Sequence, residues 1–275
     1  MSGRIRAGWV VWVVLWGVRR GGFMATFGPT DDLHGAEFVD TDLRGARFVG
    51  ADLSGVVMRG VQVEGLEIEA PWLFDGETFL LVDGVDVIPL VDAELNRRFP
   101  GRADRRATDP ERLATAWDAL ERTWAATLAR VDTMPAGTVD VSVAGEWSFA
   151  QTLRHLVLAT DTWLRKAILH EEQPYHPYGL IDAATADDGF DVSVLARDAP
   201  SYVDILEVRA GRVAMVRDVI AGVTPELLAS ARPNPHDPAY PETVLSCLHT
   251  ILEEEWEHHR YAVRDLDVIE GGTGA

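Results

Sequence analysis

The sequence predicts an α+β protein in which a short solenoid precedes an all-α, up-down four-helix bundle. Two observations carry this prediction. An apolar residue recurs at every fifth position from Leu33 to Leu73, a period that fits neither a helix nor an ordinary strand. Farther along, residues 108–270 hold four long stretches with apolar residues at helical spacing, separated by clusters rich in Pro, Gly and polar residues.

The composition fits a globular protein and excludes two kinds of partner. The 275 residues include 25 Lys and Arg against 44 Asp and Glu, for a formal net charge of −19. Because no basic surplus is available to neutralise phosphates, we expect neither nucleic acid nor a membrane as a partner. Cys247 is the single cysteine, so an internal disulfide is impossible and a reducing, cytoplasmic location fits.

Residues 1–23 differ in character from the rest of the chain. Their apolar stretch, residues 9–18, has two arginines on each side and is too short to cross a bilayer as a helix. Basic residues follow this stretch, where a signal peptide would have a cleavage site with small residues. We therefore expect residues 1–23 to be a non-native N-terminal extension and Met24 to be the natural start. A membrane anchor is the alternative.

Residues 24–76 carry the five-residue repeat, whose clearest units read AEFVD, ARFVG and ADLSG. The recurring apolar residues are Leu33, Phe38, Leu43, Phe48, Leu53, Met58, Val63, Ile68 and Leu73. A fixed short repeat is typical of a solenoid, in which each unit buries its centre against the next coil. These units resemble the pentapeptide-repeat family, which implies a square, right-handed β-helix. Nine units make only about two coils, so we expect the solenoid to dock on the following domain.

Residues 77–107 predict a hairpin followed by a linker. Residues 78–90 read as two short strands around Asp83 and Gly84, a favoured hairpin turn. Residues 96–107 contain Pro100 and Gly101 as well as five arginines, which indicates a solvated linker between domains. These arginines are Arg97, Arg98, Arg102, Arg105 and Arg106.

Residues 108–270 predict the four helices of the bundle, and residues 271–275 a flexible tail. Asp109 and Pro110 are typical of a helix start, and Ser148 with Gln151 forms a capping box. The helices are expected at about residues 110–134, 149–170, 201–222 and 244–269.

The fourth predicted helix places two polar residues, Glu255 and His259, in an apolar seam. Steps of three and four residues along it select Leu245, Leu248, Leu252, Glu255, His259, Ala262, Leu266 and Ile269. An ionised carboxylate in such a seam is costly unless something compensates it. A divalent metal would compensate both side chains, because residues four apart on a helix converge on one point. The alternative is an exposed acidic helix in which Glu255 falls in phase by chance.

His155 supplies the third candidate metal ligand. It shares a helical face with Leu156 and Trp163, so it is expected to point into the bundle. A hydrogen-bonded core histidine is the alternative interpretation. Together with Glu255 and His259 it gives two imidazoles and one carboxylate, which leaves a position open for water or substrate. This donor set favours Zn²⁺ but also suits other first-row metals. His258 is an alternative to His259 if the helix is slightly rotated.

The stretches GEWSFAQTLRHLVLATDTWL and EEEWEHHRYAVRDL resemble the DinB superfamily of metal-binding four-helix bundles. That family takes one histidine from its second helix and an (H/E)-x3-H pair from its fourth, which match His155, Glu255 and His259. Glutamate at the first place of that pair is similar to the mycothiol-dependent maleylpyruvate isomerase branch. The resemblance implies a thiol-cofactor transferase or isomerase. Bundles of this superfamily often pair, so it also allows a homodimer.

Two functions follow from these features. The first is a divalent-metal-dependent DinB-like protein that uses a low-molecular-weight thiol, of the mycothiol type, to transform a small-molecule substrate. A bound metal would lower the pKa of a thiol or water and so generate a nucleophile. The alternative is a non-enzymatic interaction protein that uses the acidic solenoid, with a structural metal in the bundle. We favour the first, and the sequence names no catalytic base.

Overall fold

The structure is a computed structural model that describes residues 25–28, 30–71, 73–74, 76–181, 192–196, 198–237 and 239–272. These residues form two compact units, the first ending at Val56 and the second beginning at Val57. The predicted N-terminal extension, residues 1–23, lies outside the described residues, and so do residues 273–275 of the predicted tail.

The repeat segment keeps its five-residue period in the backbone. A positive φ recurs at Gly35, Asp40, Gly45, Gly50, Gly55, Gly60 and Gly65. Glycine is suited to these positions because it lacks the Cβ atom that makes a left-handed conformation unfavourable. Alternate members of the series lie in hydrogen-bonded turns, the first of which joins the amide of Ala36 to the carbonyl of Leu33 at 3.0 Å.

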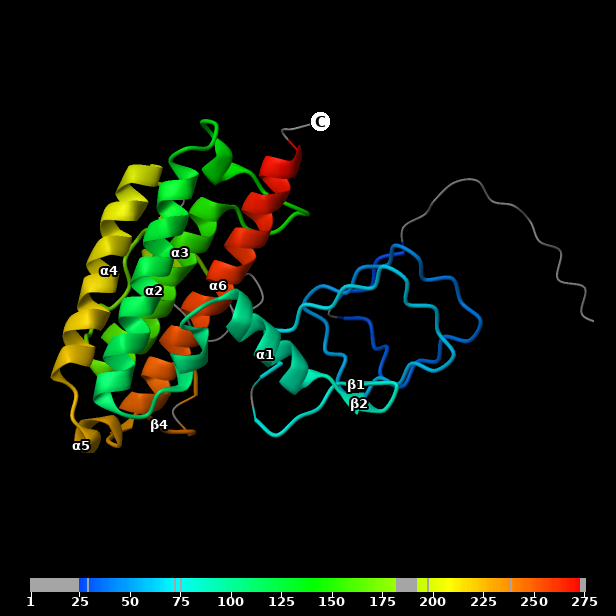
Figure 1. The fold of residues 1–275 in the computed structure, drawn as a ribbon, viewed down its shortest axis with the longest axis horizontal. Helices are drawn as coiled ribbons and strands as arrows, with labels where there is room; N and C mark the ends of the chain where they lie inside the picture. Colours follow the sequence, from blue (N-terminus) through cyan, green and yellow to red (C-terminus); the bar gives the residue numbers. More distant parts are fainter. Residues whose placement is uncertain are drawn as a thin grey trace, which may run out of the picture. The chain divides into compact units, whose positions relative to one another are not determined.

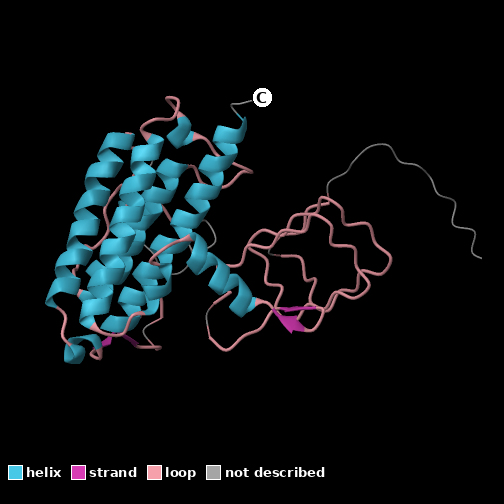
Figure 2. Cartoon of the chain, in the orientation of Figure 1, coloured by secondary structure: helices cyan, strands magenta, loops and turns pink. Residues whose placement is uncertain are grey.

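The predicted right-handed β-helix is not present in the structure, which corrects that part of the fold prediction. No described residue between 25 and 80 lies in a strand (Figure 2). The recurring apolar side chains are also not enclosed, since Phe38 is 57% and Phe48 is 62% exposed. The coils of a solenoid are held against one another by an enclosed apolar interior, and the described repeat residues do not form one.

A small hairpin and two short helices follow the repeat segment. Strands β1 (Leu81–Val82) and β2 (Val85–Asp86) pair in antiparallel fashion. The turn between them contains Asp83 and Gly84, both with positive φ, as the sequence predicts for a tight hairpin. Helix α1 (Ile88–Arg98) and the 3₁₀ helix η1 (Arg102–Arg106) come next.

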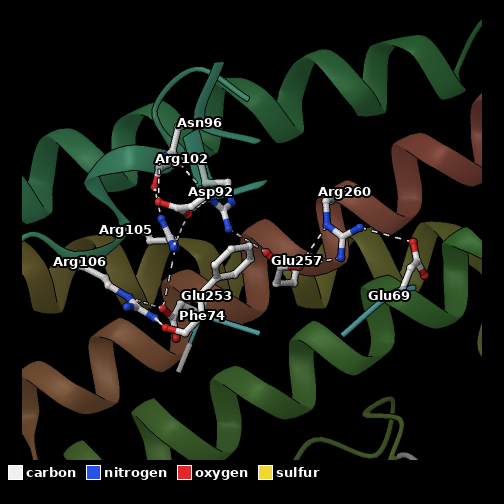
Figure 3. Close-up of polar contacts among 10 residues, drawn as sticks. All are labelled: Glu69, Phe74, Asp92, Asn96, Arg102, Arg105, Arg106, Glu253, Glu257 and Arg260. Atoms are coloured by element: carbon white, nitrogen blue, oxygen red, sulfur yellow. Dashed lines mark hydrogen bonds and ion pairs between the residues drawn. The ribbon is translucent and has the colours of Figure 1, made fainter. Parts of the chain in front are cut away.

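Two arginines of η1, Arg102 and Arg105, are buried, so the prediction of a solvated linker is corrected for these two residues. Arg102 is 1% and Arg105 is 5% exposed. Asp92 of α1 accepts hydrogen bonds from both, at 2.7 and 3.0 Å (Figure 3). A buried guanidinium group is stable only when a carboxylate compensates its charge. Arginine content alone does not show which acidic residues lie nearby.

Four long helices form the rest of the second unit and lie side by side (Figure 1). They are α2 (Pro110–Val131), α3 (Phe149–Thr160), α4 (Tyr202–Gly222) and α6 (Val244–Gly272). Helix α3 continues as a π-helix, η3 (Asp161–Ile168). Both α2 and α3 pack against α4 and α6, so α4 and α6 face each other across the core.

Shorter elements connect these helices. They are η2 (Thr138–Asp140), η4 (Val192–Val194), α5 (Pro225–Leu228) and the paired strands β3 (Ala231–Arg232) and β4 (Glu242–Thr243).

The predicted helix starts are confirmed by their caps. The Asp109 side chain accepts a hydrogen bond from the amide of Arg112 at the start of α2. Ser148 and Gln151 form both bonds of a capping box at the start of α3. These contacts satisfy amide groups that have no partner within the helix.

The core of the bundle is apolar and well buried. Its largest fully buried apolar side chains are Trp117, Trp256, Leu113, Leu120, Leu153, Leu156, Leu164, Leu248, Ile251, Leu252 and Leu266. They come from α2, α3, η3 and α6, so packing between helices is what holds these elements together. Among the described residues, no helix combines the length and the apolar character needed to span a membrane.

Candidate metal centre

Three side chains from two helices converge between α3 and α6. They are His155 of α3 and Glu254 and His258 of α6, and their potential ligand atoms all lie within 4.8 Å of one another. The Oε2 atom of Glu254 is 3.3 Å from Nε2 of His155 and 3.1 Å from Nε2 of His258. The three side chains are 16–19% exposed, so the cluster is shielded but still reachable from solvent.

The backbone fixes the tautomer of His155. Its Nδ1 atom lies 3.2 Å from the carbonyl oxygen of Leu180, which can only accept a hydrogen bond, so Nδ1 carries the proton. In the neutral ring Nε2 then has a lone pair, and it faces a carboxylate oxygen of Glu254. Two acceptors at this distance repel each other unless a proton or a metal cation lies between them.

The electrostatics of the cluster favour the protonation states that bind metals. Burial by itself would raise the pKa of Glu254, but hydrogen bonds with His155 and His258 hold this pKa well below its ordinary value. Burial lowers the pKa of His258. The acid is therefore ionised and the His258 ring neutral near pH 7, as metal coordination requires.

Aromatic rings restrict the two imidazoles. Trp147, which precedes α3, lies 4.7 Å from the His155 ring and 5.9 Å from the His258 ring, measured between centroids. The Tyr261 ring is 5.9 Å from that of His258. These contacts limit the rotation of both histidines and reduce the entropy lost when they are ordered around a ligand.

Glu255 and His259 are buried, as their seam predicts, but they do not meet His155. Glu255 is 1% exposed and accepts hydrogen bonds from Arg209 of α4. His259 is 3% exposed, and its Nε2 atom lies 2.8 Å from Oγ1 of Thr127 on α2. The predicted pair therefore does not lie beside His155 in the structure, and the α6 residues that do are Glu254 and His258.

The reason is the direction that each residue faces around α6. Consecutive residues of an α-helix point about 100° apart. The apolar seam identifies the face of α6 toward the bundle centre and the opposite helix α4, whereas a ligand set with His155 needs the face toward α3. The sequence contains two overlapping pairs, Glu254 with His258 and Glu255 with His259, and spacing alone does not choose between them.

Comparison with known proteins identifies both parts of the chain. Residues 119–262, slightly more than half of the 275 residues, match the family model of the DinB superfamily. The chain belongs to the DinB superfamily. Residues 32–63 match the pentapeptide repeats in eight copies, so both resemblances noted in the sequence are confirmed. No curated protein and no solved structure matches the chain.

The donor set of this DinB domain fits a divalent metal. Imidazole nitrogens and a carboxylate oxygen are the ligand types of Zn²⁺ and of other first-row metals. Ligand atoms bound about 2.0–2.2 Å from a zinc ion lie roughly 3–4 Å from one another. The two Glu254 contacts, at 3.3 and 3.1 Å, already fall in this range. His155, Glu254 and His258 are the residues that would hold the ion, with a further position open for water or substrate.

Proposed function

We propose that this DinB protein is a divalent-metal-dependent transferase or isomerase that activates a low-molecular-weight thiol, of the mycothiol type, against a small-molecule substrate. The observation that supports it best is the contact between Nε2 of His155 and Oε2 of Glu254, which come from different helices and would be held together by a shared proton or by a metal cation. Zinc is the metal that the donor set favours.

The three ligand residues give the site its charge and its opening. When bound, a divalent metal lowers the pKa of a coordinated thiol or water and so supplies a nucleophile at neutral pH. Two neutral imidazoles and one carboxylate cancel one charge of a divalent ion, so an anionic thiolate would be attracted. The partial exposure of the ligand side chains leaves a side from which a thiol can enter. Trp147 and Tyr261 keep the imidazoles oriented while the ligand changes.

No observation on the described repeat segment favours the alternative of a non-enzymatic interaction protein, and we do not propose it.

The first test is the metal content of the full-length chain purified without chelator. We expect about one zinc ion per chain in the wild type, and loss of this ion in His155→Ala, Glu254→Gln and His258→Ala. His249→Ala is the matched control, because His249 also lies on α6 but bonds to the carbonyl of Ala107. Full metal content in Glu254→Gln would contradict the proposed ligand set.

The second test addresses the thiol. Cobalt-substituted protein is titrated with a panel of low-molecular-weight thiols, mycothiol included, while its absorption spectrum is recorded. Direct coordination predicts a sulfur-to-cobalt charge-transfer band that is absent from Glu254→Gln. A spectrum unchanged by every thiol would leave the metal site standing but exclude the thiol-activating role.

A further inference from the structure

The loop that follows the π-helix is fastened to α3 beside His155. We infer that Arg154 and Asp161 are positioning residues for this metal ligand: together they hold residues 176–180 against α3, so that the Leu180 carbonyl fixes the orientation and tautomer of the imidazole. Only the metal-binding test of this inference rests on the proposed function, and the test of the His155 tautomer does not.

Both polar backbone groups of Leu180 are bound by neighbouring residues of α3. Its amide donates to the carbonyl of Arg154 at 3.3 Å, and its carbonyl accepts from Nδ1 of His155 at 3.2 Å. The loop therefore meets α3 at the residue before the ligand and at the ligand itself. Movement of Leu180 would displace the backbone acceptor that favours the proton on Nδ1 of His155.

The Arg154 side chain holds the two residues that precede Leu180. It is 8% exposed, and its guanidinium group donates to the carbonyls of Tyr178 and Gly179 at 3.0 and 3.4 Å. Burying a guanidinium charge whose hydrogen-bond partners are backbone carbonyls costs free energy, because a carbonyl dipole compensates the charge less well than a carboxylate would. In this chain the buried guanidinium group fixes the backbone next to Leu180, and so the position of the Leu180 carbonyl.

Asp161 holds the beginning of the same loop from the point where α3 becomes a π-helix. Its side chain is fully buried and accepts from the amide of His176 at 2.7 Å. Arg212 of α4 donates to it at 2.6 Å, and Arg165 is 3.4 Å away, so its charge is compensated. π-helical turns within α-helices often occur at functional sites, and here the turn brings a carboxylate to the loop.

Gly179 shows how closely the loop approaches α3. A Cβ atom at this position would lie 3.2 Å from the carbonyl oxygen of His176 and 3.3 Å from a Leu158 side-chain carbon. Alanine there has to displace its neighbours by a few tenths of an ångström. Gly179→Ala is therefore a mild way to shift the Leu180 carbonyl without removing a charge from the core.

A displaced loop is expected to weaken metal binding through His155. Once the Leu180 carbonyl no longer accepts from Nδ1, the ring can take either tautomer and can rotate. Only the form protonated on Nδ1 presents the Nε2 lone pair toward Glu254. Groups that do not touch the metal but hydrogen-bond to a metal-binding histidine and orient it typically contribute about 10–100-fold to metal affinity.

Two measurements on the full chain test this inference. One is the zinc affinity of Gly179→Ala, Arg154→Met and Asp161→Asn, by competition with a chromophoric chelator; we expect binding to weaken about 10–100-fold. The other is the ¹⁵N spectrum of His155 in the metal-free protein. It should show the Nδ1-protonated ring in the wild type and a mixture of tautomers in the variants. Arg154→Lys, which retains one donor, should restore part of the affinity.

Matched controls separate positioning from general destabilisation. Gly211→Ala lies in α4, where a new Cβ meets nothing within 4 Å, and Arg217→Met removes only an exposed ion pair with Glu121. Both should keep wild-type affinity and the wild-type tautomer.

The outcomes also distinguish this inference from the proposed function. Variants that fold, bind zinc as tightly as the wild type and keep the Nδ1-protonated ring would overturn the inference. If the wild type itself binds no metal, the proposed function fails. The tautomer of His155 in Gly179→Ala then decides the inference alone: a mixture supports it, and an unchanged ring overturns it.

Discussion

At the scale of single residues, Glu255 and Glu254 are adjacent but have different environments. Glu255 forms a buried ion pair with Arg209, whereas Glu254 lies between two imidazoles. Replacing Glu255 by glutamine leaves the charge of Arg209 uncompensated in the core, which should lower the free energy of unfolding by about 3–5 kcal/mol. Urea unfolding measures this change. Folded Glu255→Gln should retain its zinc, and loss of zinc without loss of stability would contradict the assignment.

Cys247 provides a second test at this scale. Its side chain is fully buried, and burial raises the pKa of its thiol to about 12. At pH 8 only about one such thiol in ten thousand is ionised, and the thiolate is the reactive form. We expect iodoacetamide to label the native protein at a negligible rate and the urea-unfolded protein readily, as followed by mass spectrometry. Equal labelling rates in the two states would contradict this burial.

At the scale of elements, α6 contributes side chains to two separate polar clusters. Glu254 and His258 face α3, whereas Glu253 and Glu257 bind arginines of η1 (Figure 3). The same arginine network also holds the segment that precedes the hairpin. The Phe74 ring lies 4.9 Å from the Arg102 guanidinium carbon. These contacts join η1, α6 and the end of the repeat segment within the second unit.

This network predicts a stability effect without an effect on the metal. Phe74→Ala removes a ring that contacts both Arg102 and Arg105, so it should lower the free energy of unfolding by about 1–3 kcal/mol. Phe79→Ala is the control, because that ring is 70% exposed. Urea unfolding and zinc content report the two properties. Equal destabilisation by the two substitutions would show that the Phe74 contacts contribute little.

At the scale of the whole molecule, the proposed metal would link α3 and α6, two helices that are distant in the sequence. A ligand that binds only the folded state at about 100 times its Kd stabilises by about 2.7 kcal/mol. For a chain of this size, metal removal should therefore lower Tm by about 5–10 °C. Calorimetry before and after chelation and zinc addition measures the shift. His155→Ala should show none, and an equal response in that variant would place the metal elsewhere.

Features specified by neighbouring residues could be predicted from the sequence. The caps at Asp109 and Ser148 and the turn at Asp83 and Gly84 depend on residues within a few positions, and each is present in the structure. Contacts between distant segments could not be predicted in this way. Arg102 and Arg105 of η1 are buried because acids of α1 and α6 lie beside them, and no local pattern shows this.

The sequence by itself determined that the chain belongs to the DinB superfamily, where its four long helices begin, and that His155 and an E-x3-H pair are the candidate ligands. Only the tertiary structure decided which pair meets His155. Helical spacing tells which residues of α6 are buried, but the side of α6 that faces α3 depends on how the helices pack. That packing turns Glu255 toward Arg209 and brings Glu254 and His258 to His155.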